Sequence, residues 1–425
     1  MKETLNFLIE VNKLKETPRT GWVWRGVKNP ETIAEHTFGT MIVSWLLAKE
    51  RGLNVKRAIK AALAHDLCEV YAGDITPNLY YPRLPRREPA RKKALMKWAR
   101  LSKKDKEKID KVKFRKEKDG LLKLISDIQP PAKDEIFSSW LDFEKGISIE
   151  GKFVNQINRI ETLIQSIKYF GTKNVKEMTT WWEWVEEQVD DPLLLKFTEV
   201  IHKKFYKWNV KSEKPLEEIL NFAVNVGQLK GMERLYWTLR GIKGPETVAG
   251  HIFTLAIAAW LLASGRKEFS MEKLLKMALC HELSAVYTGD TTPYDRILQE
   301  NSRANKEEIL KRMLRLSKKE KRSIFLKDYR EEKKSLEKLT LNLEPALKKE
   351  MIQLWKEYRT KSSPEGKFLS QLNVAVVLLQ GLLYEKKYKN FSASPLWEWA
   401  FEVSDDHLIL DFLEEMKQKF HSRTQ

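Results

Sequence analysis

Apolar residues recur at helical spacing along three stretches in the first half of the chain. They fall at mostly three- to five-residue steps from Ile33 to Leu46, form a second run from Ala58 to Leu67, and recur regularly from Phe153 to Ile167. Such spacing places the apolar side chains on one face of an amphipathic helix. We find no convincing alternation of period two, which strands would show. The pattern predicts an all-α fold with several helices in each domain.

The chain contains an internal repeat with a period of 215 residues, from Arg19 to Arg234. RTGWVWRGVKNPETIAEH, from Arg19, recurs as RLYWTLRGIKGPETVAGH from Arg234, and HDLCEVYAGDITP, from His65, recurs as HELSAVYTGDTTP from His281. RLSKKDK, GKFVNQIN and WEW have similar counterparts further along. A period this long indicates two complete domains in tandem and not a solenoid of short units.

The repeat also sets the expected domain bounds. The first copy would span residues 1–207 and the second residues 216–425, because position 1 of the first copy corresponds to position 216. Residues 208–215 between them are mostly polar and end in Pro215, as expected of a linker.

The composition and the length of the apolar stretches indicate in which cellular compartment the protein is expected. Hydrophobic residues make up 42% of the 425 residues, enough for substantial cores. The longest apolar stretches, from Met41 and from Leu255, fall short of the ~20 residues of a membrane span, and the N-terminus lacks the apolar core of a signal peptide. With two cysteines, Cys68 and Cys280, a disulfide framework is excluded, and we expect a cytoplasmic protein.

The net charge of +18 suits charged helix faces and would also attract polyanions, including nucleotides. Two matching segments are strongly basic: residues 83–119 hold 17 Lys or Arg against 6 acids, and residues 298–334 hold 13 against 7. A charged helical hairpin is the simple interpretation of these segments. The functional alternative is a contact with RNA or the ribosome through phosphates.

Histidine is scarce, and its positions suggest a metal site. Four of the seven histidines occupy equivalent places in the two copies: His36 with His251, and His65 with His281. Asp66 directly follows His65, and two adjacent side chains on a helix can still converge on one ion that lies between their directions. Imidazole together with carboxylate suits a divalent metal such as Mn, Fe, Co, Ni or Zn.

The ordered motifs resemble a known family. R-x-G-W…P-E-T-I-A-E-H and H-D-x-x-E-x-x-x-G-D-I-T-P look like the HD-domain hydrolases of the 5′-deoxynucleotidase branch, which act on nucleoside monophosphates. The basic stretch from Arg87 and LWKEYRTKSSPEGKFLSQLN from Leu354 are similar to later segments of that family. The resemblance covers both copies almost end to end and implies two tandem HD-domain helical bundles.

For the first copy, the resemblance implies a metal centre and a catalytic carboxylate. His36, His65 and Asp66 would bind a divalent ion (Mn, Co, Ni, Fe, Zn or Mg), and Glu69 would orient or deprotonate the attacking water.

The resemblance also implies the groups that would hold the substrate. Arg19 would clamp the phosphate, Trp22 would shape the nucleotide pocket, and Asp74 would line the site near the nucleotide. The product would be a nucleoside and inorganic phosphate.

The first copy departs from the family at the fourth ligand. The family has Asp where this chain has Asn158, whose amide oxygen can coordinate a metal but brings no charge. Glu161, three residues on and on nearly the same helix face, is one candidate to replace the missing carboxylate. Asp127 is a second and weaker candidate.

The second copy departs further and predicts a degenerate site formed by His251, His281, Glu282 and Asn373. Glu282 replaces the Asp of the His-Asp pair, Ala285 replaces the water-handling Glu, and Val376 stands at the position of Glu161. Arg234, Trp237 and Asp290 remain. We interpret this copy as catalytically inactive.

Two functions remain open from the sequence. The first is a metal-dependent phosphomonoesterase that hydrolyses (deoxy)nucleoside 5′-monophosphates at the N-terminal site. The alternative is an inactive HD pseudoenzyme that serves as a basic scaffold for nucleotide, RNA or the ribosome. Because relatives in the family are often dimers, we expect the two copies to pack as a pseudo-dimer. We also expect Trp182, Trp184, Trp397 and Trp399 to be core residues.

Overall fold

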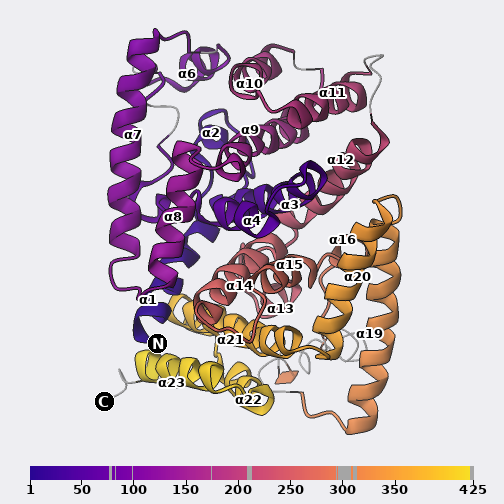
Figure 1. Cartoon of the computed structure of the whole chain (residues 1–425). Helices are drawn as coiled ribbons and strands as arrows, with labels where there is room; N and C mark the ends of the chain where they lie inside the picture. Colours follow the sequence, from indigo (N-terminus) through magenta and orange to yellow (C-terminus); the bar gives the residue numbers. More distant parts are fainter. Residues whose placement is uncertain are drawn as a thin grey trace. The chain divides into compact units, whose positions relative to one another are not determined.

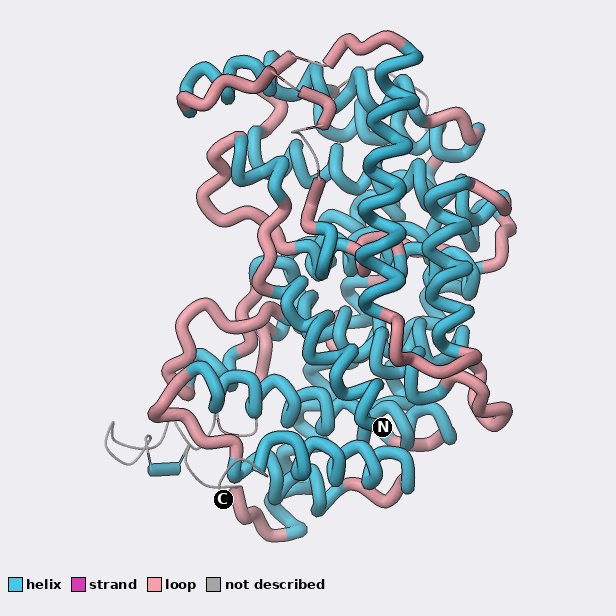
Figure 2. The backbone as a smooth tube through the Cα atoms, turned by 90° about the vertical axis from the view of Figure 1, so that its left-hand side faces the viewer, coloured by secondary structure: helices cyan, strands magenta, loops and turns pink. Residues whose placement is uncertain are grey.

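The structure, a computed structural model of the chain, describes residues 1–75, 79–81, 83–97, 99–173, 175–207, 213–292, 294, 308–309 and 314–421. Within these residues helices dominate, and β structure is confined to two isolated bridges, Pro18–Thr32 and Glu233–Thr247 (Figure 2). The predicted all-α fold is confirmed. Thr76 and Pro77 of the Gly-Asp loop, most of the expected linker and much of the basic segment 298–334 lie outside the described residues.

The chain folds as two compact units. The N-terminal unit is Ile9–Gly227, and the C-terminal unit combines Met1–Leu8 with Gln228–Gln425. These bounds differ from those of the repeat at the first helix of each copy: most of α1 (Lys2–Val11) belongs to the C-terminal unit, and α12 (Lys214–Val226) belongs to the N-terminal unit. The repeat shows which sequence was copied, whereas packing shows which core each helix joins.

In the N-terminal unit, α3, α4, α8 and α9 pack against one another, and the long helix α7 runs beside α8 (Figure 1). The three helices expected from apolar spacing are α3, α4 and α9. Besides α12, the helices of this unit are α2 Thr20–Trp24, α3 Ile33–Arg51, α4 Val55–Ala64, α5 Glu69–Ala72, α6 Glu88–Leu95, α7 Lys103–Leu124, α8 Ala132–Lys145, α9 Ile149–Phe170, α10 Val175–Gln188 and α11 Pro192–Tyr206.

The C-terminal unit repeats this arrangement, with α14, α15, α20 and α21 packed together. Its helices are α13 Leu235–Leu239, α14 Val248–Ala263, α15 Met271–Cys280, α16 Ala285–Thr288, α19 Lys318–Leu339, α20 Pro345–Thr360, α21 Pro364–Lys387, α22 Ser394–Val403 and α23 His407–His421. Among the described residues, one helix, α21, is long and apolar enough to cross a membrane, but 78% of its most apolar window is buried inside the fold, as in a core helix.

Local sequence sets where three of the candidate ligands lie. Thr32 caps α3 in a capping box with Glu35, which starts the helix so that His36 falls in its first turn. Helix α4 starts at its Asn54 cap and ends at Ala64, so His65 and Asp66 follow at its C-terminal end. Since α3 and α4 pack side by side, these histidines come together at one end of the helix pair.

A glycine allows the close approach of α8 and α9. A Cβ atom on Gly151 would lie 2.3 Å from the backbone oxygen of Asp142, and the equivalent Gly366 would meet the oxygen of Glu357 at 2.4 Å. Backbone atoms cannot swing aside as a flexible side chain can, so the two helices must separate to admit a methyl group.

We therefore expect Gly151→Ala to reduce the free energy of unfolding by about 2–3 kcal/mol and to lower Tm by about 5–10 °C. Gly227→Ala is the matched control, because Gly227 has φ −58° and no atom lies within 4 Å of the position that the new methyl group would take. Thermal unfolding followed by circular dichroism checks both, and equal Tm values for the two variants would contradict the packing argument.

Candidate metal and phosphate site

His65 and Asp66 present adjacent ligand atoms. The Nδ1–H of His65 donates to the carbonyl oxygen of Ala62 at 2.6 Å, which leaves Nε2 as the nitrogen with a free lone pair. This Nε2 is buried, has no hydrogen-bond partner, and lies 3.1 Å from Oδ2 of Asp66. A buried, unsatisfied imidazole nitrogen beside a carboxylate is the arrangement that a bound cation would complete.

His36 lies between two side chains of α9. Its Nδ1 is 2.6 Å from Oε2 of Glu161, and its Nε2 is 2.7 Å from Oδ1 of Asn158 and 3.9 Å from Oδ2 of Asp66. With Nδ1–H donating to the Glu161 carboxylate, Nε2 is free to bind a metal on the side of Asn158 and Asp66.

The geometry bears on the choice of the fourth ligand. Glu161 contacts the nitrogen of His36 that faces away from Asp66, which suits a role in orienting the ring. Glu161 also forms a second group with Glu31 and His36 whose ligand atoms lie within 4.8 Å of one another. Asp127 is exposed and does not line the cavity described below. Asn158 therefore remains the fourth candidate ligand. Two imidazole nitrogens, one carboxylate and one amide oxygen fit a divalent ion of borderline hardness.

Arg19 lies at the N-terminal end of α2, where two carboxylates hold its side chain. Its Nη1 donates to Oδ2 of Asp66 at 2.7 Å, and its Nε lies 4.0 Å from Oδ2 of Asp74, which also accepts the backbone N–H of Thr20. Burial alone would lower the pKa of Arg19, but Asp66 and Asp74 outweigh it and raise that pKa. The guanidinium is therefore a fixed positive charge next to the candidate ligands.

Glu69 has the character of a catalytic carboxylate. Its side chain is buried, and Oε2 has no hydrogen-bond partner. Burial raises the pKa of the Glu69 carboxyl well above its usual range, and the negative charges of Asp66 and Asp74 raise it further. A carboxylate with a raised pKa is a stronger base than an ordinary one, which suits proton abstraction from water.

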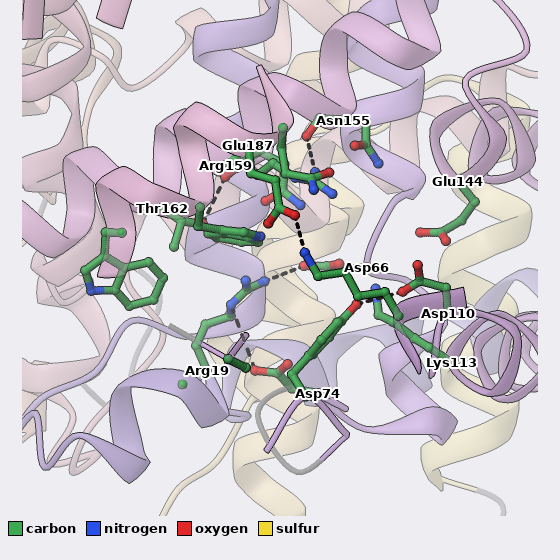
Figure 3. A pocket seen from close by; sticks show the side chains of 18 of the residues that line it. Arg19, Asp66, Asp74, Asp110, Lys113, Glu144, Asn155, Arg159, Thr162 and Glu187 are labelled. Carbon is green, nitrogen blue, oxygen red and sulfur yellow. Dashed lines mark hydrogen bonds and ion pairs between the residues drawn. The ribbon is translucent and has the colours of Figure 1, made fainter. Parts of the chain in front are cut away.

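Arg19, Glu69 and the candidate ligands Asp66 and Asn158 open onto one cavity of about 550 Å³ within the N-terminal unit. In Figure 3, Arg19 and Asp74 lie on one side of Asp66, and Arg159 and Asn155 lie on the other. Trp22 lines the cavity although it is almost fully buried, and its Nε1 donates to Glu31 at 3.0 Å. Arg19, Trp22, Asp66, Glu69, Asp74 and Asn158 all line this space. His36 and His65 do not line it, but their ring nitrogens converge with the carboxylate of Asp66.

Sequence reasoning missed some residues of the cavity wall. Trp184 is half-buried and lines the cavity, so the prediction that it is a core residue was wrong, whereas Trp182 is buried as predicted. Glu31, which accepts a hydrogen bond from Trp22, lies in the repeated P-E-T motif and has the counterpart Glu246, so the internal repeat could have identified this residue.

Cys68 is buried and its thiol pKa is raised by burial, as expected of a structural cysteine.

The C-terminal unit keeps the shape of the site but changes its chemistry. His251, His281 and Glu282 still converge, and Nε2 of His251 lies 2.7 Å from Oδ1 of Asn373. The pKa of His251 is lowered to about 3 by burial and by nearby Arg234.

Three further changes distinguish this second site. The side-chain amide of Asn373 donates to the hydroxyl of Tyr358, where the first copy has Phe143. Nδ1 of His251 has no hydrogen-bond partner, because Val376 stands at the position of Glu161. Ala285, at the position of Glu69, offers no group that could handle a proton.

Comparison with known proteins agrees with this geometry. The HD domain family matches residues 11–193, 226–329 and 326–398. The 5′-deoxynucleotidase HDDC2 of Bos taurus is 31% identical over 173 residues, which cover 41% of this chain and 71% of that protein. The 5′-deoxynucleotidase hdd1 of Schizosaccharomyces pombe is 28% identical over 188 residues, 44% of this chain and 83% of that protein.

A third relative, the 5′-deoxynucleotidase YGK1 of Saccharomyces cerevisiae, is 30% identical over 177 residues, 41% of this chain and 71% of that protein. The family match extends over both copies of the repeat. The chain therefore belongs to the HD domain family, with its 5′-deoxynucleotidases as similar proteins.

Proposed function

We propose that the N-terminal unit is a metal-dependent phosphomonoesterase that hydrolyses (deoxy)nucleoside 5′-monophosphates to a nucleoside and phosphate. The observation that carries the proposal is the convergence of His36, His65 and Asp66, together with the unsatisfied carboxylate of Glu69, which lines the same cavity as Asp66. The names of the relatives support a nucleotide as the substrate.

His36, His65, Asp66 and Asn158 would hold the divalent ion. When bound, the ion supplies Lewis acidity, which lowers the pKa of water and polarises the phosphoryl group. Glu161 keeps His36 oriented through Nδ1, and the carbonyl of Ala62 does the same for His65. Because the two imidazole rings are held in place, they need little reorientation during catalysis.

Glu69 and Arg19 would carry the remaining chemistry. Glu69 takes a proton from the attacking water, whose oxygen forms the new bond to phosphorus as the bond to O5′ breaks, and O5′ then takes up a proton. Arg19 offers its guanidinium to the phosphate oxygens, and Asp66 and Asp74 hold it in place. The C-terminal unit would not hydrolyse a substrate, because it lacks the group equivalent to Glu69.

The proposal is tested by measuring phosphate release from a panel of ribo- and deoxynucleoside 5′-monophosphates with added Mn²⁺, Co²⁺, Ni²⁺ or Mg²⁺. We expect turnover that depends on the metal and stops with a chelator. Absence of turnover with every metal, combined with salt-sensitive binding of RNA, would instead support the inactive scaffold. RNA contact through residues 83–119 stays a prediction.

The role assigned to Glu161 gives a separate prediction about metal affinity. Glu161→Val installs the residue of the second copy and removes the acceptor at Nδ1 of His36. We expect metal affinity to fall about 10- to 100-fold, because the ring loses its orienting partner. Isothermal titration with Mn²⁺ checks this, with Glu199→Gln as control, because Glu199 is an exposed residue of α11 that does not line the cavity. Unchanged affinity in Glu161→Val would show that the contact does not serve the metal.

A further inference from the structure

The cavity contains a guanidinium without a carboxylate partner. Arg159 follows Asn158 on α9, and its Nη1 donates to the backbone oxygen of Asn155 one turn earlier. Its Nε is shut off from solvent without a hydrogen-bond partner, and burial lowers the pKa of the side chain. Within the described residues Arg159 forms no ion pair. Such a group is costly to bury and is retained where a ligand satisfies it.

An acceptor without a partner lies on the same cavity wall. Glu144, near the end of α8, lines the cavity and makes no hydrogen bond or ion pair within the part of the chain that the structure describes. Its charge acts on Arg159, yet the two side chains do not pair (Figure 3). A donor and an acceptor therefore face one space without satisfying each other.

The charges around this wall decide which ligand fits. The cavity lining holds Lys113, Lys145 and Arg159 together with Glu144 and Asp110. Lys113 pairs with Glu117 at 3.2 Å, and the Nζ of Lys145 lies 3.6 Å from the centroid of the Phe114 ring. The carboxylates of Glu144 and Asp110 would repel a second phosphate. A neutral group with both donors and acceptors on its edge fits better.

The aromatic side chains that line the cavity indicate a ligand that contains a flat ring. Trp184 lies under Arg159, with the guanidinium carbon 5.4 Å from the ring centroid, and Phe114, Tyr80 and Trp181 also line the cavity. Flat aromatic surfaces stack on nucleobases whatever their sequence. The polar side chains that line the cavity can then form hydrogen bonds with the edge of the base.

The internal repeat provides a comparison within one chain. Glu144 corresponds to Arg359 and Arg159 to Val374 in the second copy, so both groups are lost together with the group equivalent to Glu69. In that copy Arg359 forms an ion pair with Glu332 at 2.8 Å, whereas Arg159 forms none within the described residues. The unpaired donor and acceptor thus occur in the copy that retains the site.

We propose that Arg159 and Glu144 read the base of the substrate nucleotide and select guanine, an inference that rests on the proposed nucleotidase function. Guanine presents acceptors at O6 and N7, which match a guanidinium fork, and donors at N1 and its amino group, which match a carboxylate. Adenine places an amino group where guanine has O6, so Arg159 would face a donor.

The test compares kcat/KM for the four 2′-deoxynucleoside 5′-monophosphates, with p-nitrophenyl phosphate as a substrate without a base. We expect the guanine nucleotide to exceed the adenine nucleotide by about 10- to 100-fold. Glu144→Gln and Arg159→Val should remove most of this preference and leave p-nitrophenyl phosphate hydrolysis within about twofold. Glu107→Gln, an exposed glutamate on α7, is the control that removes an equal charge.

Equilibrium binding separates this inference from the proposed function. Isothermal titration of the wild type with dGMP and dAMP reports base selection even if no substrate is turned over. Turnover without guanine preference would overturn the inference and leave the phosphomonoesterase standing. A variant that slows p-nitrophenyl phosphate as much as dGMP would show a structural role for its residue. Preference for a nucleoside bisphosphate, lost in Arg159→Val, would assign Arg159 to a second phosphate and refute base reading.

Discussion

Asp66→Ala is expected to reduce phosphate release by at least about 10³-fold, because Lewis-acid stabilisation of the transition state amounts to several kcal/mol. In the proposed ligand set of His36, His65, Asp66 and Asn158, Asp66 would be the sole charged ligand. The variant also leaves Arg19 without the partner that its Nη1 contacts at 2.7 Å. Steady-state phosphate release and Mn²⁺ titration measure the two consequences separately.

Glu282→Ala is the matched control, since Glu282 occupies the same position in the second copy and pairs with Arg234 in the same way. We expect its rate of phosphate release to stay within about twofold of wild type, because Ala285 leaves that copy without a proton acceptor. Loss of activity in Glu282→Ala at unchanged Tm would place turnover in the second copy and contradict our assignment. Full activity in Asp66→Ala would contradict the metal site itself.

The sequence alone singled out His36, His65 and Asp66 as candidate ligands because each lies in a short motif that occurs twice. His36 falls in the first turn of a capped helix, and His65 and Asp66 fall at the end of the next one, so local signals were enough to suggest them. The all-α fold followed from apolar spacing for the same reason. Such features depend on residues that are close in the chain.

The features that the sequence did not reveal depend on long-range packing. Glu161 lies 125 residues from His36 in the chain, and only the packing of α3 on α9 shows that its carboxylate faces Nδ1 of His36. The relative placement of α8, α9 and α10 determines that Trp184 faces the cavity. It also determines that Arg159 and Glu144 do not pair. Periodicity places a side chain on a helix face but does not say what stands opposite.

Glu69→Gln is expected to lower kcat by about 10²- to 10⁴-fold, the range typical of losing a general base. The amide has nearly the same shape as the carboxylate but cannot accept a proton from water. Metal affinity should stay within about threefold of wild type, because Glu69 is not part of the group formed by His36, His65 and Asp66. Phosphate release and Mn²⁺ titration, run in parallel, separate the loss of the base from loss of the metal.

Stability provides the control for Glu69→Gln. Burial and the nearby Asp66 and Asp74 raise the pKa of Glu69. A carboxyl whose pKa is raised on folding weakens the fold as pH rises from its unfolded value toward its folded value. The neutral amide removes this penalty, so the variant should have a Tm at pH 7 at least equal to that of the wild type. A lower Tm together with weaker Mn²⁺ binding would mean that Glu69 supports the structure of the site, and the loss of kcat would then not identify it as the base.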